Sequence, residues 1–433
     1  MPYYSTRNRS VRVTLRQALL GSLPADGGLY MPERIDPLPP GFFETAPAKS
    51  FQEIAWAMAN SLFRGDPGED TLQRIVAEAF DFRVPLVKLA DGLYALELFH
   101  GPTLAFKDFA ARFMARLMAS VAAGEDRELH ILVATSGDTG SAVAHGFHNV
   151  GGIRVHILFP AGRVSPIQRA QLTTMGGNIS ALEVAGTFDD CQSMVKEAFL
   201  DRTIGARLLL SSANSINIAR LIPQSIYYCW AWAQLEDRAR PAVISVPSGN
   251  LGNLTAGLIA KRMGLPVRRF VAATNVNDAL PRYLMTGRYV TRPAVTTLSN
   301  AMDVSDPSNF ARILDLYDGD RSRLGDDIQG FAFGDDQTPA AICELYGRYH
   351  YVADPHGAVG YLGMKSYLES IDDSVSGIFL ETAHPAKFPE ILRQAAGITL
   401  PVPPQIRDLQ DKESRAIRIQ NDFAELKEYL LSC

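Results

Sequence analysis

The chain is 433 residues long, with 47% hydrophobic residues and a formal net charge of -5 at pH 7. That length suffices for about two or three globular domains. Lysine and arginine are spread along the sequence without a basic block, which argues against nucleic acid or an anionic membrane as a partner.

Targeting and metal-binding patterns are missing as well. Residues 1–16 carry charges and lack the apolar stretch of a signal peptide, and no segment is apolar for long enough to cross a bilayer. We therefore expect a cytoplasmic protein. The four cysteines are far apart and match no zinc spacing, so we expect no metal site.

The first elements predict a small N-terminal cap. Residues 5–82 show helical fragments broken by turns that contain Pro and Gly. Two short strands, 86–89 and 93–98, follow around an Asp91-Gly92 turn.

A helix is predicted from about Phe106. Apolar residues recur there at helical spacing, after a Gly-Pro turn. Lys107 then lies in the first turn, where the helix macrodipole and the neighbouring Phe side chains both favour a neutral amine. Such a lysine can attack a carbonyl, so Lys107 is a candidate Schiff-base nucleophile. The alternative is a solvated lysine without a function.

Beyond this helix, strand-like and helix-like segments alternate. The β-branched runs are 129–134, 155–159, 179–184, 208–210 and 243–246, and the amphipathic segments are 139 onward, 167–175, 189–200, 217–234 and 254–263. This alternation predicts an α/β fold, a parallel sheet with helices on both faces. Because ligands bind at the carboxyl ends of such strands, the loops that follow them are candidate sites.

The first of these loops, 134–141, holds two glycines between a strand and a helix. Its backbone N–H groups and hydroxyls could bind an anion. The candidate residues are Thr135, Ser136, Gly137, Asp138 and Thr139. Asp138 is unexpected at an anion site and would have to point away or bind a protonated group. A tight turn with a capped helix is the alternative.

The second loop, 211–220, places polar residues after another strand. Asn214, Ser215 and Asn217 are followed by Arg220. A guanidinium can bind phosphate or carboxylate through two parallel hydrogen bonds, so the loop predicts a second anion site. A solvated helix cap with a surface arginine would give the same pattern.

The third loop runs from Ser248 to Asn253 and precedes a predicted helix. Gly249 and Gly252 let the backbone approach a ligand, and the helix dipole favours a phosphate. The loop matches neither a Walker A motif nor the dinucleotide fingerprint, so it gives no support to a nicotinamide-dependent dehydrogenase.

The C-terminal part begins with a turn-rich, polar region, 275–336. The elements predicted after it are a helix (339–349), a second helix after a turn at 356–360, a strand (377–380) and a closing helix (413–431). Thr382 follows the strand, where its hydroxyl could donate to a ring nitrogen or cap a helix.

A carbonyl-reactive lysine, a glycine-rich phosphate loop and two further anion loops on one parallel sheet are the parts of a pyridoxal phosphate enzyme. The additional anion loops predict an amino acid substrate with a second anionic group.

The same segments resemble the threonine synthase family, of the longer bacterial and fungal type, within the fold type II pyridoxal phosphate enzymes. The matching motifs are FHGPTLAFKD (99–108), ATSGDTG (134–140), SANSIN (212–217) and PSGNLGN (247–253), with DGGLYMP (26–32) near the start. The resemblance covers the chain from about residue 5 to beyond residue 380.

This resemblance implies two parallel-type open α/β sheets with helices on both faces, and conversion of O-phospho-L-homoserine and water to L-threonine and phosphate. Lys107 would hold pyridoxal 5'-phosphate, and Thr382 would face the pyridine nitrogen. The phosphate of the cofactor would be bound by Ser248, Gly249, Asn250, Leu251, Gly252 and Asn253. The first loop would hold the substrate carboxylate, and the candidates for the substrate phosphate are Asn214, Ser215, Asn217 and Arg220.

One position departs from the wider fold type, because many of its other members have Asn in place of Asp138. Asn can donate to the phenolate oxygen of the cofactor, whereas an ionised Asp cannot. The partner of that oxygen is therefore left open.

The expected domains are an N-terminal cap (1–82), a large cofactor domain (83–107 and 213–400), a small α/β domain (108–212) and a C-terminal helical extension (401–433). We expect a monomer or homodimer.

Two other functions compete with this interpretation. Another fold type II amino acid lyase or dehydratase, with a substrate that lacks phosphate, would share Lys107 and the glycine loop but not the second anion site around Arg220. A non-catalytic binding protein of the same fold would leave Lys107 inert and would purify colourless.

Overall fold

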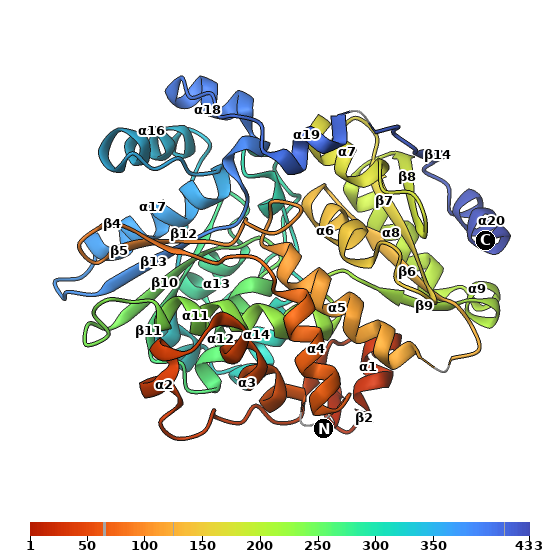
Figure 1. The fold of residues 1–433 in the computed structure, drawn as a ribbon, viewed down its shortest axis with the longest axis horizontal. Coiled ribbons are helices and arrows are strands. Elements are labelled where there is room, and N and C mark those ends of the chain that lie inside the picture. The colour runs from red at the N-terminus through yellow and green to blue at the C-terminus, as the bar shows by residue number, and fades with distance from the viewer. Residues whose placement is uncertain (64–65, 124, 411) are drawn as a thin grey trace.

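The computed structural model describes residues 1–63, 66–123, 125–410 and 412–433. Two mainly parallel sheets with helices on both faces make up the body of the molecule, and an N-terminal cap lies along one side of both (Figure 1). The predicted α/β architecture is confirmed. None of the helices that the structure describes is long and apolar enough to span a bilayer.

The large sheet has the strand order β12-β11-β10-β13-β5-β4. Its strands are β4 (Leu86–Ala90), β5 (Leu93–Glu97), β10 (Ala242–Pro247), β11 (Val267–Thr274), β12 (Ile328–Ala332) and β13 (Ser376–Glu381). Neighbouring strands are parallel except for β4 and β5, which form the predicted hairpin. β10 is buried along its whole length, as expected for an apolar strand covered on both faces.

Helices cover both faces of this sheet, and α17 packs against β10, β11 and β13. The helices of this part are α10 (Ile218–Leu221), α11 (Ile226–Ala233), α12 (Gly252–Arg262), α13 (Ala279–Thr286), α14 (Phe310–Leu316), α15 (Arg321–Asp327), α16 (Gln337–Tyr349), α17 (Pro355–Glu369) and α18 (Pro389–Ala396), with 3-10 turns η2 (Ile222–Ser225), η3 (Asn300–Met302) and η4 (Pro385–Lys387). The helix α5 (Lys107–Ala122) follows β5 but packs mainly against α6 (Asp138–Phe147) of the small sheet and α4 (Glu69–Ala79) of the cap.

The small sheet has the order β14-β8-β7-β6-β9, and all its neighbouring strands are parallel. Its strands are β6 (Leu129–Ala134), β7 (Ile153–Pro160), β8 (Ile179–Ala185), β9 (Leu209–Ser212) and β14 (Ile417–Gln420). The helices around it are α6 (Asp138–Phe147), α7 (Pro166–Thr173), α8 (Phe188–Leu200), α9 (Arg202–Arg207), α19 (Pro404–Gln410) and α20 (Phe423–Ser432).

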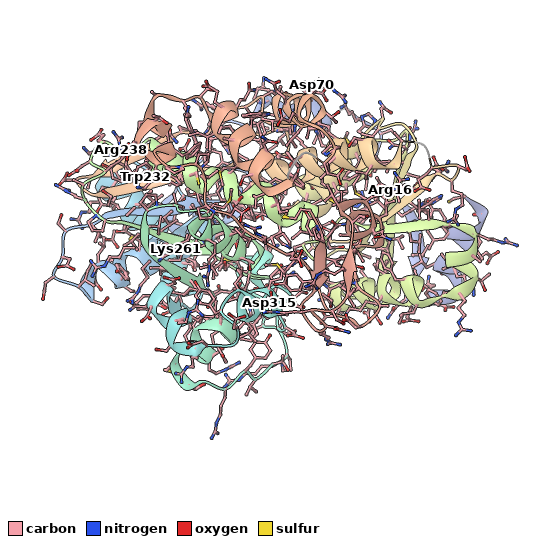
Figure 2. All side chains as sticks on the ribbon, turned by 90° about the horizontal axis from the view of Figure 1, so that it is seen from below. Arg16, Asp70, Trp232, Arg238, Lys261 and Asp315 are labelled. Carbon is pink, nitrogen blue, oxygen red and sulfur yellow. The ribbon has the colours of Figure 1, made fainter. Side chains whose placement is uncertain are left out.

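The cap contains the predicted helical fragments and also a three-stranded antiparallel sheet that the sequence analysis did not predict. Its elements are β1 (Tyr3–Ser5), β2 (Arg12–Val13), β3 (Tyr30–Pro32), α1 (Leu15–Gly21), α2 (Phe42–Thr45), η1 (Ala46–Ala48), α3 (Phe51–Phe63) and α4 (Glu69–Ala79). Tyr4 and Arg9 bind Asp315 of α14, which ties the cap to the large sheet. Asp315 is labelled in Figure 2.

Three predicted stretches were wrong in detail. Residues 275–336 form helices α13 to α15 and add strand β12 to the large sheet. The predicted helix 217–234 is divided into α10, η2 and α11, where Pro223 lacks the N–H that a continuous helix requires. The predicted closing helix 413–431 begins instead with β14, which adds an edge strand beside β8.

Candidate active site

Lys107 is the first residue of α5, and so lies in the first turn of the helix that the sequence predicts from about Phe106. The segment before it is fixed to the chain that follows β13, because Phe106 donates its N–H to the Thr382 carbonyl oxygen at 2.9 Å and Ala105 pairs with Ala383. The loop from β5 thus places Lys107 beside the carboxyl end of β13.

The surroundings of Lys107 favour its neutral form. Part of the side chain keeps solvent access, but the ammonium lies deep enough for burial to lower its pKa to about 8. Asp138 opposes this shift, while the positive charges of Arg220 and Lys387 add to it. About one tenth of Lys107 is then uncharged at pH 7, far more than for an ordinary lysine.

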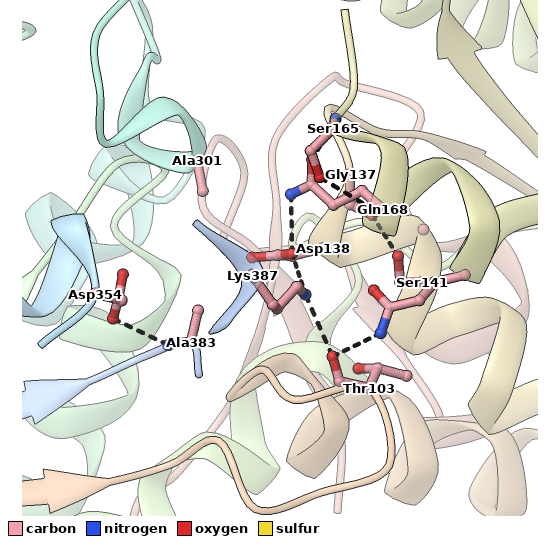
Figure 3. Close-up of polar contacts among 12 residues, drawn as sticks. Thr103, Gly137, Asp138, Ser141, Ser165, Gln168, Ala301, Asp354, Ala383 and Lys387 are labelled. Carbon is pink, nitrogen blue, oxygen red and sulfur yellow. Dashed lines mark hydrogen bonds and ion pairs between the residues drawn. The ribbon is translucent and has the colours of Figure 1, made fainter. Parts of the chain in front are cut away.

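Asp138 is the first residue of α6. Its carboxylate binds a protonated group, the ammonium of Lys387, as expected for an acid in an anion-binding loop. Its Oδ1 accepts from Lys387 Nζ at 2.6 Å and from Gln168 Nε2 at 3.0 Å (Figure 3). Burial alone would raise the pKa of Asp138, but the charges of Lys387 and Lys107 and these hydrogen bonds hold it well below its ordinary value. Asp138 is therefore ionised at neutral pH.

The first loop keeps its turn through Thr135. The Thr135 hydroxyl accepts from the N–H groups of Gly137 and Gly140, both at 2.9 Å. Gly137 has a φ of 140°, which only glycine adopts without strain. Three backbone N–H groups of this loop, those of Ser136, Asp138 and Thr139, have no acceptor among the described residues.

Two residues of the second loop connect the three loops. Asn214 donates through Nδ2 to the Ala134 carbonyl oxygen at 2.9 Å, at the start of the first loop. Ser215 Oγ accepts from Asn250 Nδ2 of the third loop at 2.5 Å. The three loops that the sequence singled out are thus in direct contact.

Asn217 lies in the second loop, but its side chain is directed toward the cap. It is fully buried, and its amide donates to the Leu19 carbonyl oxygen, Ser22 Oγ and the Ser212 carbonyl oxygen. These contacts hold the cap against the second loop. They leave Asn217 no free donor, so the structure does not support its predicted contact with a substrate phosphate.

Arg220 is a buried cation without a carboxylate partner in the described chain. Its Nη1 donates to the Ala213 carbonyl oxygen at 2.6 Å, while the buried Nε has no partner there. Burial lowers the pKa of Arg220 to about 10. An anionic ligand bound beside Lys107 would pair with the unused donors of this guanidinium.

The third loop is held by side chains of its own. Ser248 Oγ donates to Asn253 Oδ1 at 2.7 Å, and Asn253 Nδ2 donates to the Pro247 carbonyl oxygen at 2.8 Å. Leu251 has a φ of 57°, in the left-handed region, and precedes the first residue of α12. Side chains thus fold the backbone into a closed turn at the helix N-terminus.

This turn presents a group of unpaired donors. No hydrogen bond between described residues uses the backbone N–H groups of Gly249, Asn250, Leu251, Gly252 and Asn253. A Cβ on Gly249 would lie 2.7 Å from Met302 Cα, so η3 packs directly on the loop. Convergent N–H groups at a helix N-terminus fit a phosphate group.

Arg312 of α14 supports the second and third loops. It is fully buried and donates to the carbonyl oxygens of Tyr30, Ser215 and Ile216 and to Asn309 Oδ1. Asn309 Nδ2 in turn donates to the Asn250 carbonyl oxygen at 3.0 Å.

Thr382 follows β13 and is buried. The chain after it is held by Asp354, whose Oδ2 accepts the Ala383 N–H at 3.2 Å (Figure 3). Asp354 Oδ1 lies 2.5 Å from His356 Nδ1, and His356 Nε2 accepts from the Ala301 N–H at 3.2 Å. Asp354 and His356 therefore connect Thr382 to η3 and so to the third loop.

The sequence analysis missed Lys387, Gln168, Asp354, His356 and Arg312. Lys387, Gln168 and Arg312 bind partners far away in sequence, so no local pattern reveals those contacts. Asp354 could have been found as a helix cap, because an Asp followed by Pro is a common start of a helix.

Comparison with known proteins identifies the family. The model of pyridoxal-phosphate dependent enzymes matches residues 82–379, and models of the threonine synthase N-terminus and C-terminal region match residues 2–80 and 357–430. A threonine synthase from Haemophilus influenzae is 44% identical over 435 residues, which is 100% of both chains. The chain belongs to the threonine synthase family.

Solved structures of threonine synthases have the same fold. The Escherichia coli structure superposes with a TM-score of 0.93 at 39% identity and covers 100% of both chains. The Brucella melitensis threonine synthase, solved with pyridoxal phosphate bound, has a TM-score of 0.92 at 35% identity, over 99% of this chain and 98% of that chain. The protein is a fold type II, pyridoxal phosphate-dependent enzyme.

Proposed function

We propose that the protein converts O-phospho-L-homoserine and water to L-threonine and phosphate. The observation that carries this proposal is Arg220, a buried guanidinium with unused donors that is separate from the N–H cradle of residues 249–253. One phosphate site serves the cofactor, so a second anion site near Lys107 fits a substrate that carries its own phosphate.

The residues of the third loop and of β13 would hold the cofactor. Lys107 would attach to its aldehyde, Thr382 would face the ring nitrogen, and the loop from Ser248 to Asn253 would bind the phosphate through its unpaired N–H groups. When bound, pyridoxal phosphate supplies an electron sink that stabilises negative charge on the substrate carbons.

Lys107 would also move protons. The Lys107 amine, with a pKa of about 8, would take a proton from Cα and then one from Cβ. The electron pair left at Cβ would form a double bond to Cγ as the bond between Cγ and the phosphate oxygen breaks. Cγ would then gain a proton, water would add its hydroxyl at Cβ and give its other proton to the released phosphate, and Cα would regain a proton. Ser136, Asp138 and Thr139 would hold the substrate carboxylate through their N–H groups, with Thr135 and Gly137 shaping the turn.

Arg220, with Asn214 and Ser215 close by in the same loop, would bind the leaving phosphate. A positive charge fixed there favours departure of phosphate, because the charge on the leaving group grows as the bond breaks. A fold type II lyase or dehydratase for substrates without phosphate would have no use for this guanidinium.

The direct test incubates the purified holoenzyme with O-phospho-L-homoserine and follows phosphate release, L-threonine formation and the visible spectrum together. We expect equal amounts of both products, and neither product nor cofactor absorbance with Lys107→Ala. Turnover of serine or threonine without release of phosphate from O-phospho-L-homoserine would contradict the proposal.

We further propose that the protein acts in the cytoplasm as a monomer or homodimer, on this small molecule alone and without nucleic acid. The proposed domains are the cap (1–82), the cofactor domain (83–107 and 213–400), the small domain (108–212) and a C-terminal extension (401–433) that includes β14.

A further inference from the structure

Lys387 and Asp138 form a buried ion pair between the two halves of the molecule. Lys387 ends η4, which follows β13 of the large sheet, and Asp138 begins α6, which follows β6 of the small sheet. The Lys387 side chain is 0% exposed and that of Asp138 is 5% exposed. This is the contact drawn at the centre of Figure 3.

The ion pair fixes the orientation of the Asp138 carboxylate. Lys387 Nζ and Gln168 Nε2 both donate to Oδ1, and Lys387 also donates to the Thr103 carbonyl oxygen at 3.2 Å. A Cβ on Gly137 would lie 2.4 Å from the Gln168 side chain, so the amide of Gln168 packs directly against the loop. Asp138 is therefore held from α7 and from η4 at once.

The charge of Asp138 lies in a loop that has to bind an anion. The unpaired N–H groups of this loop belong to Ser136, Thr139 and Asp138 itself. An unpaired carboxylate at this place would repel the carboxylate of a substrate, since like charges interact strongly where water is excluded. Lys387 supplies one positive charge directly on Asp138 and so cancels that repulsion.

We propose that Lys387 is a positioning residue that turns Asp138 away from the substrate and neutralises it, so that the first loop can bind the carboxylate of the amino acid. The proposal rests on the proposed function only in that the bound anion is an amino acid carboxylate. An ionised Asp at position 138 needs a positively charged partner, whereas a neutral Asn there would not.

The experiment measures binding of two probes to the holoenzyme by calorimetric titration. L-threonine carries the carboxylate without phosphate, and inorganic phosphate carries the other anion alone. We expect Lys387→Met to raise the Kd for L-threonine about tenfold or more and to change that for inorganic phosphate little. The double variant Asp138→Asn/Lys387→Met should bind L-threonine within about threefold of the unchanged protein, because it removes both charges.

A matched control is Lys427→Met. Lys427 forms an ion pair of the same length, 2.6 Å, with Asp201, between α20 and the start of α9. We expect this change to leave both dissociation constants unaltered.

The proposal is overturned if Lys387→Met binds L-threonine normally, or if the double variant binds it as weakly as the single one. A double variant that does not fold also overturns it, since Lys387 would then serve packing alone. Failure of the proposed function has another signature: the unchanged holoenzyme would release no phosphate from O-phospho-L-homoserine.

Discussion

Three buried cations of this site differ in the partners that their side chains bind. Lys387 is paired with a carboxylate, and Arg312 is satisfied by backbone carbonyl oxygens and an amide. The buried Nε of Arg220 has no hydrogen-bond acceptor in the described chain. Since an unsatisfied buried charge is costly, its retention points to a ligand that pairs with it.

Arg220→Ala should therefore act on the substrate and not on the cofactor. We expect kcat/KM for O-phospho-L-homoserine to fall about 100-fold or more, as for loss of a charged hydrogen-bond donor to a substrate anion, with the visible spectrum of the holoenzyme retained. Steady-state kinetics and an absorption spectrum check this. Arg116→Ala, at a salt bridge to Glu78 on the surface of α5, is the control and should change neither. Loss of the cofactor spectrum with Arg220→Ala would show that Arg220 serves the cofactor instead.

The pKa of Lys107 predicts a pH dependence. Only the neutral amine attacks the aldehyde, so the rate at which pyridoxal phosphate reattaches to the apoenzyme should rise with pH and level off above about 8. Stopped-flow absorbance measures this rate from about pH 6 up to pH 10.5, the pKa of an ordinary lysine. A rate that keeps rising toward pH 10.5 would mean that burial does not lower this pKa.

At the scale of elements, the sequence predicted the loops well because each is a local pattern. A strand followed by Gly and hydroxyl residues is a local pattern typical of a ligand loop in a parallel sheet, although a capped turn gives the same pattern. The position of Lys107 follows from the helical spacing of its neighbours. The supporting contacts could not be predicted, since Asp138 and Lys387 are 249 positions apart. Asn217 shows that a polar residue in such a loop can bind a neighbouring element instead of a ligand, and the local pattern does not distinguish the two roles.

Gly249 tests the fit between the third loop and η3. A Cβ there would lie 2.7 Å from Met302 Cα and 3.0 Å from the Ala301 carbonyl oxygen, which are backbone atoms that cannot rotate away. We expect Gly249→Ala to weaken cofactor binding at least about tenfold and to cost about 1–3 kcal/mol of stability. Cofactor titration and thermal unfolding measure both.

The matched control is Gly205→Ala in α9, where a Cβ meets nothing within 4 Å. It should bind the cofactor normally and unfold no earlier, because Ala favours a helix over Gly. Equal cofactor affinity for Gly249→Ala and Gly205→Ala would contradict the packing argument.

For the whole molecule, the alternation of strands and helices predicted the fold class, but the pairing of strands far apart in the sequence could not be predicted. β12 and β14 are short strands that depend on neighbours in the sheet, and the cap sheet contains a strand of only two residues. Strand propensity is weak where tertiary pairing decides, so such segments resemble loops in the sequence. β14 and α20 bring the end of the chain back onto the small sheet.

His156 tests how the end of the chain is held. It is fully buried between His130, 3.0 Å from its Nε2, and the Tyr429 hydroxyl of α20, 3.2 Å from its Nδ1. Burial, with smaller contributions from His130 and Arg154, lowers the pKa of His156 to about 3. The unfolded chain binds a proton below about pH 6.5, so the stability that neutral His156 contributes is lost as the pH falls from there toward 3.

Urea unfolding at pH 7.5 and pH 5 measures this contribution. The unchanged protein should lose about 2 kcal/mol more than His156→Gln between these conditions. His350→Asn, at an exposed histidine, should behave like the unchanged protein. Equal losses for the unchanged protein and His156→Gln would show that His156 takes up its proton in the folded state.

The central claim is that one buried amine, Lys107, carries the cofactor. The most direct measurement treats the holoenzyme with borohydride, digests it and maps the peptides by mass spectrometry. We predict a single pyridoxyl label, on Lys107. A label on another lysine, such as Lys387, or no label at all would contradict the account.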